Sequence, residues 1–197
     1  LGEVTVQLPV LGAHNVRNAM LALAVAMECG VDVGAAAQAI GAMPQLSMRS
    51  TLDTLGDLLL LNDAYNANPA SAREALVTLD AIGGERPRVA VLGSMLELGS
   101  QGPALHDEIA ARALASKAML IAGIGEFVSA LERVAAGDPR VLLAPDAEAL
   151  WPLLAARLPS NAVILLKGSR GTRLERLVPH LRRFAGLPAS EPDATHH

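Results

Sequence analysis

The sequence predicts an α/β protein whose main part is an open, mostly parallel sheet with helices on both faces. From residue 49 onward, short apolar segments alternate with amphipathic helical segments. This alternation is typical of parallel strands joined by right-handed crossovers. Polar residues gather directly after the apolar segments, and open α/β sheets bind their ligands at these carboxyl ends. The fold class therefore already indicates where a site should lie.

The first 48 residues follow a different pattern. Apolar residues recur at helical spacing over 14–29, and Gly30 then ends the predicted helix. A second helix is predicted to follow Asp32, its N-cap, and to run to about Met43. Only the alternating stretch Val4–Leu8 predicts a strand in this part. Two apolar helices and one strand cannot bury one another, so we expect this segment to be the end of a larger domain.

Residues 49–186 hold the predicted sheet. Its strands are expected over 50–55, 58–62, 88–92, 118–122, 141–144 and 162–166, and its helices over 69–82, 103–116, 126–136, from about 146, and over 172–184. Pro69 suits a first helical turn, whereas Pro152 predicts a late start or a kink in the helix from 146. Residues 187–197, which end in two histidines, are predicted to be a disordered tail or a tag remnant.

The composition argues against several classes of protein. The 16 basic and 20 acidic residues give a net charge of −4, and aromatic residues make up only 2%, which disfavours nucleic-acid binding. The apolar runs are too short for a membrane span, and the chain shows no secretory signal, so we expect a cytoplasmic protein. The single cysteine, Cys29, is predicted to be a small core residue. No obligate protein partner is evident.

The most polar connection joins an apolar strand to the helix that begins at Pro69. Asp63 could hold a ribose diol or a metal, Tyr65 could pack on a ring, and Asn66 and Asn68 could orient a polar ligand. Helix capping explains Asn68 equally well. Ordinary turn chemistry leaves the other three side chains unused, and we therefore predict a functional loop.

A second candidate loop, Lys167–Gly171, follows the last predicted strand. Its two glycines let the backbone approach a ligand, and Lys167 and Arg170 beside a helix N-terminus favour an anion. A solvated turn is the alternative interpretation.

Three further residues have both a structural and a functional interpretation. Arg49 stands alone between the two parts of the chain, where it could form an ion pair or reach a phosphate. Glu97 and His106 could be acid–base groups, but we interpret them as an exposed glutamate and a helix-surface histidine.

Taken together, these strings resemble the Mur ligase family, and within it the branch that adds D-alanyl-D-alanine to UDP-N-acetylmuramoyl-tripeptide. The matching strings span most of the chain from Gly12 onward: Gly12-x-His14-Asn15-Val16-x-Asn18-Ala19, Arg49, Asn62-Asp63-Ala64-Tyr65-Asn66-Ala67-Asn68-Pro69-x-Ser71, Val91-Leu92-Gly93-x-Met95-Leu96-Glu97-Leu98-Gly99 and Lys167-Gly168-Ser169-Arg170. The Tyr-Asn-Ala-Asn-Pro string is the most specific of them.

The resemblance implies a domain order and a reaction. Residues 1–48 would be the end of the central ATPase domain, residues 49–186 a complete Rossmann-like third domain. ATP would phosphorylate the terminal carboxylate of UDP-N-acetylmuramoyl-tripeptide, and the amine of D-alanyl-D-alanine would attack the acyl phosphate.

The resemblance also implies residue roles. Asn15 and Asn18 would face the adenine of ATP, Arg49 its phosphates and Asp63 its ribose. A second group would line the cleft where nucleotide and dipeptide meet: Tyr65, Asn66, Asn68, Lys167, Ser169 and Arg170.

The chain departs from the family pattern in two ways. Ser94 stands where the family usually has an aspartate, and no Gly-x-x-Gly-Lys-[Ser/Thr] phosphate loop occurs in the 197 residues. Acyl phosphate chemistry needs a phosphate cradle and a metal, so we expect Mg²⁺ ligands mainly upstream and no ligation by this chain alone. The alternatives are another amide ligase, such as a folylpolyglutamate synthase, which the Tyr65–Pro69 string disfavours, and a non-catalytic nucleotide-binding module.

Overall fold

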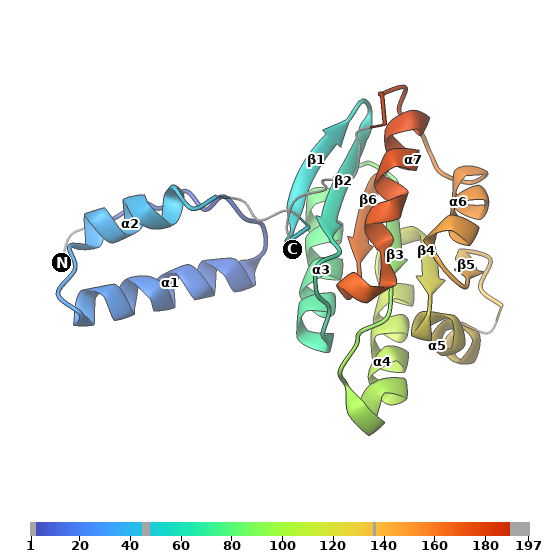
Figure 1. Ribbon diagram of the computed structural model, residues 1–197, viewed down its shortest axis with the longest axis horizontal. Helices are drawn as coiled ribbons and strands as arrows, with labels where there is room; N and C mark the ends of the chain where they lie inside the picture. The colour runs from blue at the N-terminus through green and yellow to red at the C-terminus, as the bar shows by residue number, and fades with distance from the viewer. Residues whose placement is uncertain (1–2, 45–47, 136, 190–197) are drawn as a thin grey trace.

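The computed structural model describes residues 3–44, 48–135 and 137–189, and these form two parts (Figure 1). The first part is a pair of helices, α1 (Ala13–Glu28) and α2 (Val33–Gly41). Asp32 caps α2 as predicted, because its carboxylate accepts a hydrogen bond of 2.9 Å from the backbone N–H of Ala35. The second part is a six-stranded α/β domain.

The sheet has the strand order β1-β2-β6-β3-β4-β5. β1 and β2 form an antiparallel hairpin, and all other neighbours run parallel. The strands are β1 (Thr51–Leu55), β2 (Leu58–Asp63), β3 (Arg88–Leu92), β4 (Ala118–Ile124), β5 (Val141–Ala144) and β6 (Val163–Lys167). β6, the last strand in sequence, enters between β2 and β3, and this crossover brings two distant loops to the same edge.

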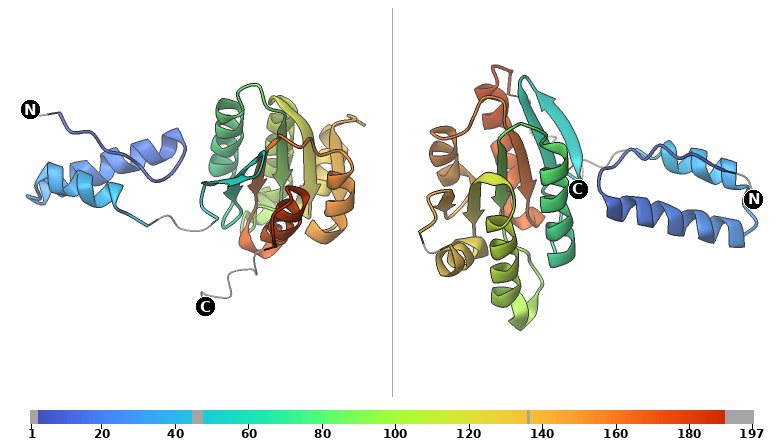
Figure 2. Two further views of the ribbon diagram at one scale, coloured as in Figure 1. Left: turned by 90° about the horizontal axis from the view of Figure 1, so that it is seen from above. Right: turned by 180° about the vertical axis from the view of Figure 1, so that it is seen from behind.

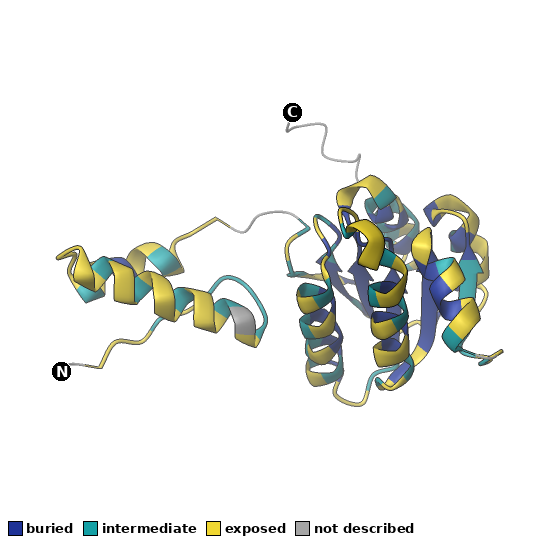
Figure 3. Cartoon of the chain, turned by 90° about the horizontal axis from the view of Figure 1, so that it is seen from below, coloured by how far each residue is buried: buried dark blue, intermediate teal, exposed yellow. Residues whose placement is uncertain are grey.

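Helices cover both faces of the sheet (Figure 2). One face carries α3 (Pro69–Ile82), α4 (Gly102–Leu114) and α5 (Glu126–Val134), and the other carries α6 (Ala147–Ala155) and α7 (Leu177–Phe184). Each face encloses its own apolar core. The central strands β2, β6, β3 and β4 are mostly buried, whereas the edge strands β1 and β5 are more exposed (Figure 3). The predicted open, mostly parallel, Rossmann-like fold is therefore confirmed.

An aromatic cluster joins α6 to α7. The ring of Trp151 stacks on His180 with 5.1 Å between centroids, and the ring of Phe184 meets Trp151 edge-on at 6.2 Å. The Nε2 atom of His180 also lies 3.1 Å from a carboxylate oxygen of Glu148. Side-chain packing and one polar contact thus fix the two helices to each other.

Two predicted elements are wrong. Val4–Leu8 forms neither strand nor helix, since no strand of the described chain pairs with it. The helix predicted over 172–184 starts only at Leu177. It is preceded by the short 3₁₀ turns Arg170–Thr172 and Leu174–Arg176, because Arg173 between them adopts a left-handed conformation with φ of 54°.

Smaller differences have local causes. α6 begins directly after its N-cap Asp146, so Pro152 lies inside the helix without delaying its start. Cys29 is exposed rather than part of a core, because nothing in the described chain covers this end of α1. Of the predicted tail, residues 190–197 lie outside the described residues, whereas Leu187 packs against the core beside α7.

Among the described helices, none is long and apolar enough to cross a membrane.

Candidate functional site

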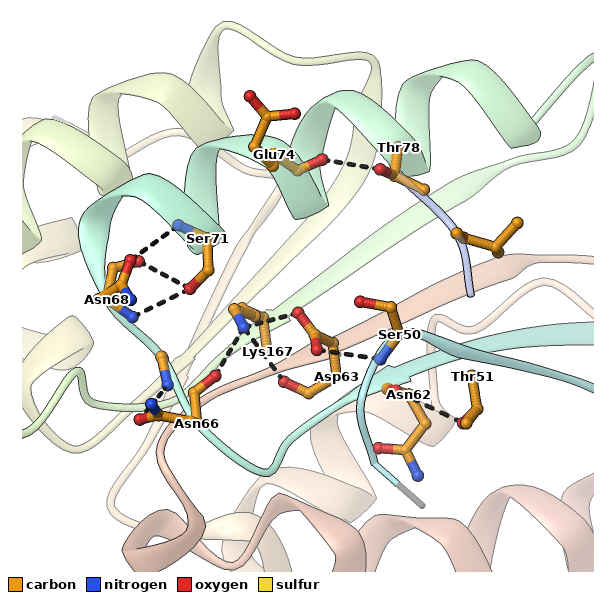
Figure 4. Close-up of polar contacts among 12 residues, drawn as sticks. Ser50, Thr51, Asn62, Asp63, Asn66, Asn68, Ser71, Glu74, Thr78 and Lys167 are labelled. Atoms are coloured by element: carbon orange, nitrogen blue, oxygen red, sulfur yellow. Dashed lines mark hydrogen bonds and ion pairs between the residues drawn. The ribbon is translucent and has the colours of Figure 1, made fainter. Parts of the chain in front are cut away.

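A buried ion pair links the carboxyl ends of β2 and β6. Asp63 and Lys167 are register partners on these parallel strands, and the Nζ atom of Lys167 lies 2.6 Å from Oδ2 of Asp63. The Lys167 side chain is only 2% exposed and that of Asp63 is 14% exposed. Figure 4 shows both side chains meeting beside the loop that follows β2. The predicted loops thus meet at one edge of the sheet.

Lys167 also fastens the loop itself. Its ammonium donates a hydrogen bond of 2.6 Å to the backbone carbonyl of Asn66. Burial lowers the pKa of Lys167 below its ordinary value, while the Asp63 carboxylate acts in the opposite direction. The Lys167 ammonium therefore places a positive charge beside Asp63 and also fixes the position of the loop through the Asn66 carbonyl.

Asp63 ties this loop to the junction between the two parts of the chain. Its Oδ1 atom accepts a hydrogen bond of 3.0 Å from the backbone N–H of Ser50. The backbone N–H of Tyr65 donates to the carbonyl of Met48 at 3.1 Å. Met48 and Ser50 have positive φ values of 58° and 53°, which are unfavourable for residues other than glycine. Site contacts hold the junction in this conformation.

The ring of Tyr65 lies close to two cations. The guanidinium carbon of Arg49 is 4.3 Å from the ring centroid, and that of Arg170 is 5.7 Å from it. The backbone N–H of Arg170 also donates to the Tyr65 carbonyl at 3.1 Å. These contacts place two positive charges beside the Asp63 loop.

A cavity of about 450 Å³ opens at this edge, a size typical of small-molecule sites. It is lined by eight of the ten predicted site residues: Asn15, Asn18, Arg49, Asp63, Tyr65, Asn66, Asn68 and Lys167. Apolar residues of the helical pair, including Ala19, Ala22 and Ile40, complete its wall. We call this the first cavity.

Three amide side chains of this cavity also serve the local backbone. Asn15 donates to the carbonyl of Leu11 at 2.7 Å, and the Asn66 amide oxygen accepts from the next backbone N–H at 2.9 Å. Asn68 is the N-cap of α3, and it forms a reciprocal capping box with Ser71. The capping alternative for Asn68 is thus realised, although the residue still lines the cavity.

Ser169 and Arg170 do not line the first cavity. Ser169 turns towards the loop after β3, where its hydroxyl accepts a hydrogen bond of 3.0 Å from the N–H of Leu96. A second cavity, of about 410 Å³, lies on that side of the domain. Its lining includes Ser94, Leu96, Gly125, Arg173 and Arg176.

The glycines of the Lys167–Gly171 loop have a packing role. A Cβ atom on Gly168 would lie 2.7 Å from Oγ1 of Thr172, and one on Gly171 would lie 3.0 Å from a methyl carbon of Leu96. The backbone therefore lies too close to neighbouring side chains for a larger residue at these two positions. The glycines are explained by this packing, whereas we had predicted that they let the backbone approach a ligand.

Sequence reasoning misplaced His106. It is 2% exposed and contacts the backbone of the loop after β3, so it is not a helix-surface residue. The spacing of His106 from the buried Ile109, Ala110 and Ala113 on α4 is the helical signal that could have found it. Arg173 and Arg176, which line the second cavity, were not among the predicted site residues.

In the described part of the chain, no three His, Cys, Asp or Glu side chains come together as a metal site. The Mg²⁺ implied by the sequence resemblance stays a prediction, and no step is assigned to it on these residues.

Comparison with known proteins identifies similar sequences. Residues 48–170 match the family described as "Mur ligase, glutamate ligase domain". The UDP-N-acetylmuramoyl-tripeptide--D-alanyl-D-alanine ligase of Mycobacterium tuberculosis (strain ATCC 25618 / H37Rv) is 35% identical over 195 residues, covering 87% of this chain and 38% of the relative. The enzyme of the same name from Bacillus subtilis is 32% identical, covering 91% and 40%. This chain thus spans about two fifths of the length of these relatives.

Solved structures agree in fold. A crystal structure of MurF from Acinetobacter baumannii superposes with a TM-score of 0.80 at 28% identity, covering 92% of this chain and 40% of that one. A MurF ligase from Thermotoga maritima in complex with ADP gives a TM-score of 0.73 at 22% identity, which supports the fold alone.

Proposed function

Because the chain belongs to the Mur ligase family, we propose that it is the carboxyl-terminal part of an ATP-dependent ligase that adds D-alanyl-D-alanine to UDP-N-acetylmuramoyl-tripeptide. In this reaction ATP phosphorylates the terminal carboxylate of the tripeptide, and the dipeptide amine displaces phosphate from the acyl phosphate. Residues 1–48 belong to the central ATPase domain in this proposal, and residues 49–186 form the third domain.

One observation supports the nucleotide assignment above all others. The first cavity combines two amides of α1, Asn15 and Asn18, with the charged residues Arg49 and Asp63 from the other part of the chain. Such a combination suits a ligand with a polar base at one end and an anionic group at the other. Asn15 and Asn18 face the adenine, and Arg49 faces the phosphates.

Asp63 faces the ribose in this proposal. Each of its carboxylate oxygens already accepts one hydrogen bond or ionic contact, from Ser50 or Lys167. Each oxygen retains a second lone pair, and the side chain is 14% exposed, so both are consistent with hydrogen bonds from a diol. Lys167 fixes the carboxylate in that orientation.

The dipeptide lies between the Tyr65 loop and the second cavity. Tyr65, Asn66, Asn68 and Lys167 form the nucleotide side of this cleft, and Ser169 and Arg170, which line neither cavity, complete it. Arg173 and Arg176, which line the second cavity, supply cations that suit the terminal carboxylate of a dipeptide.

Calorimetric titration of magnesium-ATP into this chain tests the nucleotide assignment. We expect weak binding that falls at least about tenfold in Asp63→Ala, because a charge-assisted contact to the ribose contributes roughly 1.5–3 kcal/mol. Asp57→Ala is the matched control, since Asp57 lies in the β1–β2 turn and lines neither cavity.

Other results would point elsewhere. Nucleotide binding that is unaffected by both Asp63→Ala and Arg49→Ala would favour a non-catalytic nucleotide-binding module. Ligation of dipeptide by the purified chain alone would contradict the expectation that it is inactive by itself.

A further inference from the structure

The imidazole of His106 is held between two backbone groups of opposite kind. Its Nδ1 atom lies 2.7 Å from the carbonyl oxygen of Gly102, and its Nε2 atom lies 2.9 Å from the backbone nitrogen of Met95. A carbonyl can only accept a hydrogen bond, and a backbone N–H can only donate one. The geometry therefore requires a neutral ring with its proton on Nδ1 and a bare Nε2.

Met95, whose N–H His106 accepts, lies between Ser94 and Leu96, and both neighbours form hydrogen bonds of their own. The hydroxyl of Ser94 accepts a hydrogen bond of 2.9 Å from the N–H of Glu126 at the start of α5. The N–H of Leu96 donates to the hydroxyl of Ser169 at 3.0 Å, and the N–H of Ser169 donates to the Ser94 carbonyl, also at 3.0 Å. Three consecutive residues are thus fastened to three different segments.

Packing alone does not require histidine at this position. The ring of His106 meets the buried Phe127 edge-on, with 4.9 Å between centroids. An apolar side chain of similar size would fill the same space. It would leave the Met95 N–H without an acceptor inside the domain, where Met95 is 3% exposed and an unpaired donor is costly. The acceptor nitrogen is therefore the specific contribution of His106.

We propose that His106 is a positioning residue, whose neutral Nδ1–H form holds Met95 and so places Ser94 and Leu96 in the wall of the second cavity. Its importance for catalysis rests on the proposed function, which puts the dipeptide on this side of the site. His106 acts through the loop after β3 and lines neither cavity itself.

The protonation state is tested on the unmodified chain. Long-range ¹⁵N–¹H NMR spectra at neutral pH distinguish a protonated ring nitrogen from a bare one. We expect the His106 ring to show a protonated Nδ1 and an unprotonated Nε2. A proton on Nε2 would overturn the proposal.

Two variants test the positioning role. His106→Gln keeps an acceptor oxygen on a side chain of similar reach, whereas His106→Leu keeps apolar bulk without an acceptor. We expect amide exchange of Met95 to accelerate about tenfold in His106→Leu, as the loss of one buried hydrogen bond implies, and to stay near the unmodified rate in His106→Gln. The amide of Ile121 in the central sheet is the internal reference. Equal exchange of Met95 in the two variants would contradict the proposal.

The same samples separate this proposal from the proposed function. Titration with D-alanyl-D-alanine is expected to shift the amide signals of Ser94, Leu96 and Gly125, and to shift them less in His106→Leu than in His106→Gln. If the unmodified chain shows no shifts, the dipeptide assignment fails, and the ring nitrogens and the Met95 exchange still decide the role of His106. Equal shifts in the unmodified chain, His106→Leu and His106→Gln would refute the proposal that His106 positions the cavity wall for the dipeptide.

Discussion

At the scale of single residues, the Asp63–Lys167 pair organises the candidate site. Lys167 holds both the Asp63 carboxylate and the Asn66 carbonyl from a buried position. Asp63 in turn holds the Ser50 N–H at the junction. Each member of the pair thus connects segments that are far apart in the sequence. Substituting either residue should therefore disturb both the loop after β2 and the junction at Ser50.

Replacing Lys167 with methionine keeps the side-chain stem and removes the charge. We expect the free energy of unfolding at neutral pH to fall by about 1–3 kcal/mol, because Asp63 loses its partner and the Asn66 carbonyl loses its donor. Urea unfolding measures this change. Arg73→Met is a suitable comparison, since Arg73 forms an exposed ion pair with Glu108 and should change stability by less than about 1 kcal/mol.

The lowered pKa of Lys167 gives this pair a pH dependence. Its pKa in the folded chain lies below the ordinary value of 10.5. Between these two values the unfolded chain binds more protons than the folded chain, so the free energy of unfolding rises with pH across that window. Unfolding curves recorded at increasing alkaline pH should show this rise in the original chain and a smaller one in Lys167→Met. Parallel pH profiles for the two proteins would contradict the assignment.

Asn68 allows capping and ligand binding to be separated. Asn68→Asp keeps a capping oxygen, whereas Asn68→Ala should cost about 1 kcal/mol of stability through the start of α3. If Asn68 also orients a ligand through its amide, both variants should weaken magnesium-ATP binding in calorimetry. Weakening in the alanine variant alone would leave capping as the whole role of this residue.

At the scale of elements, the helices and strands predicted from the sequence match the structure where local contacts determine their bounds. The helix over 69–82 was predicted with its observed bounds, because Asn68, Pro69 and Ser71 specify its start within a few residues. The start of α7 was missed, because Arg173 takes a left-handed conformation that nothing in the local sequence indicates. Val4–Leu8 has the alternation of a strand, but a strand also needs a partner.

The junction before β1 offers a test at this scale. Ser50 has a φ of 53°, and glycine adopts this conformation without steric cost. Ser50→Gly retains the backbone N–H that Asp63 accepts, so we expect thermal unfolding to show a gain of roughly 0.5–1 kcal/mol. Thr51→Gly, one residue later in β1, should instead destabilise the domain. A loss of stability in Ser50→Gly would argue against strain at the junction.

At the scale of the whole molecule, the two parts differ in how they bury apolar surface. The six-stranded domain encloses two cores, whereas α1 exposes a row of large apolar side chains that includes Met20, Leu21 and Val25. The fold and the residue types of the first cavity were predictable, because strand and helix patterns and polar strand ends are visible in sequence. The hydrogen bond between His106 and Met95 was not predictable from the sequence, because the conformation of the loop after β3 determines which backbone N–H reaches the imidazole.

The exposed face of α1 predicts self-association of this chain. Leu21 and Val25 are 66% and 62% exposed, and contiguous apolar surface of this kind associates in water. Sedimentation velocity should show concentration-dependent oligomers, and Leu21→Glu combined with Val25→Glu should reduce them. Val77→Glu on α3, where Val77 is also exposed, should leave association unchanged. Persistence of the oligomers in the double variant would assign them to another surface.

The position of Trp151 determines what optical spectroscopy can report about this protein. It is the single tryptophan of the chain, and it stacks on His180 between α6 and α7 while lining neither cavity. Intrinsic fluorescence should therefore follow the docking of these two helices. It should be nearly silent when a nucleotide enters the first cavity. An emission change during such a titration would be a signal of long-range rearrangement in the domain.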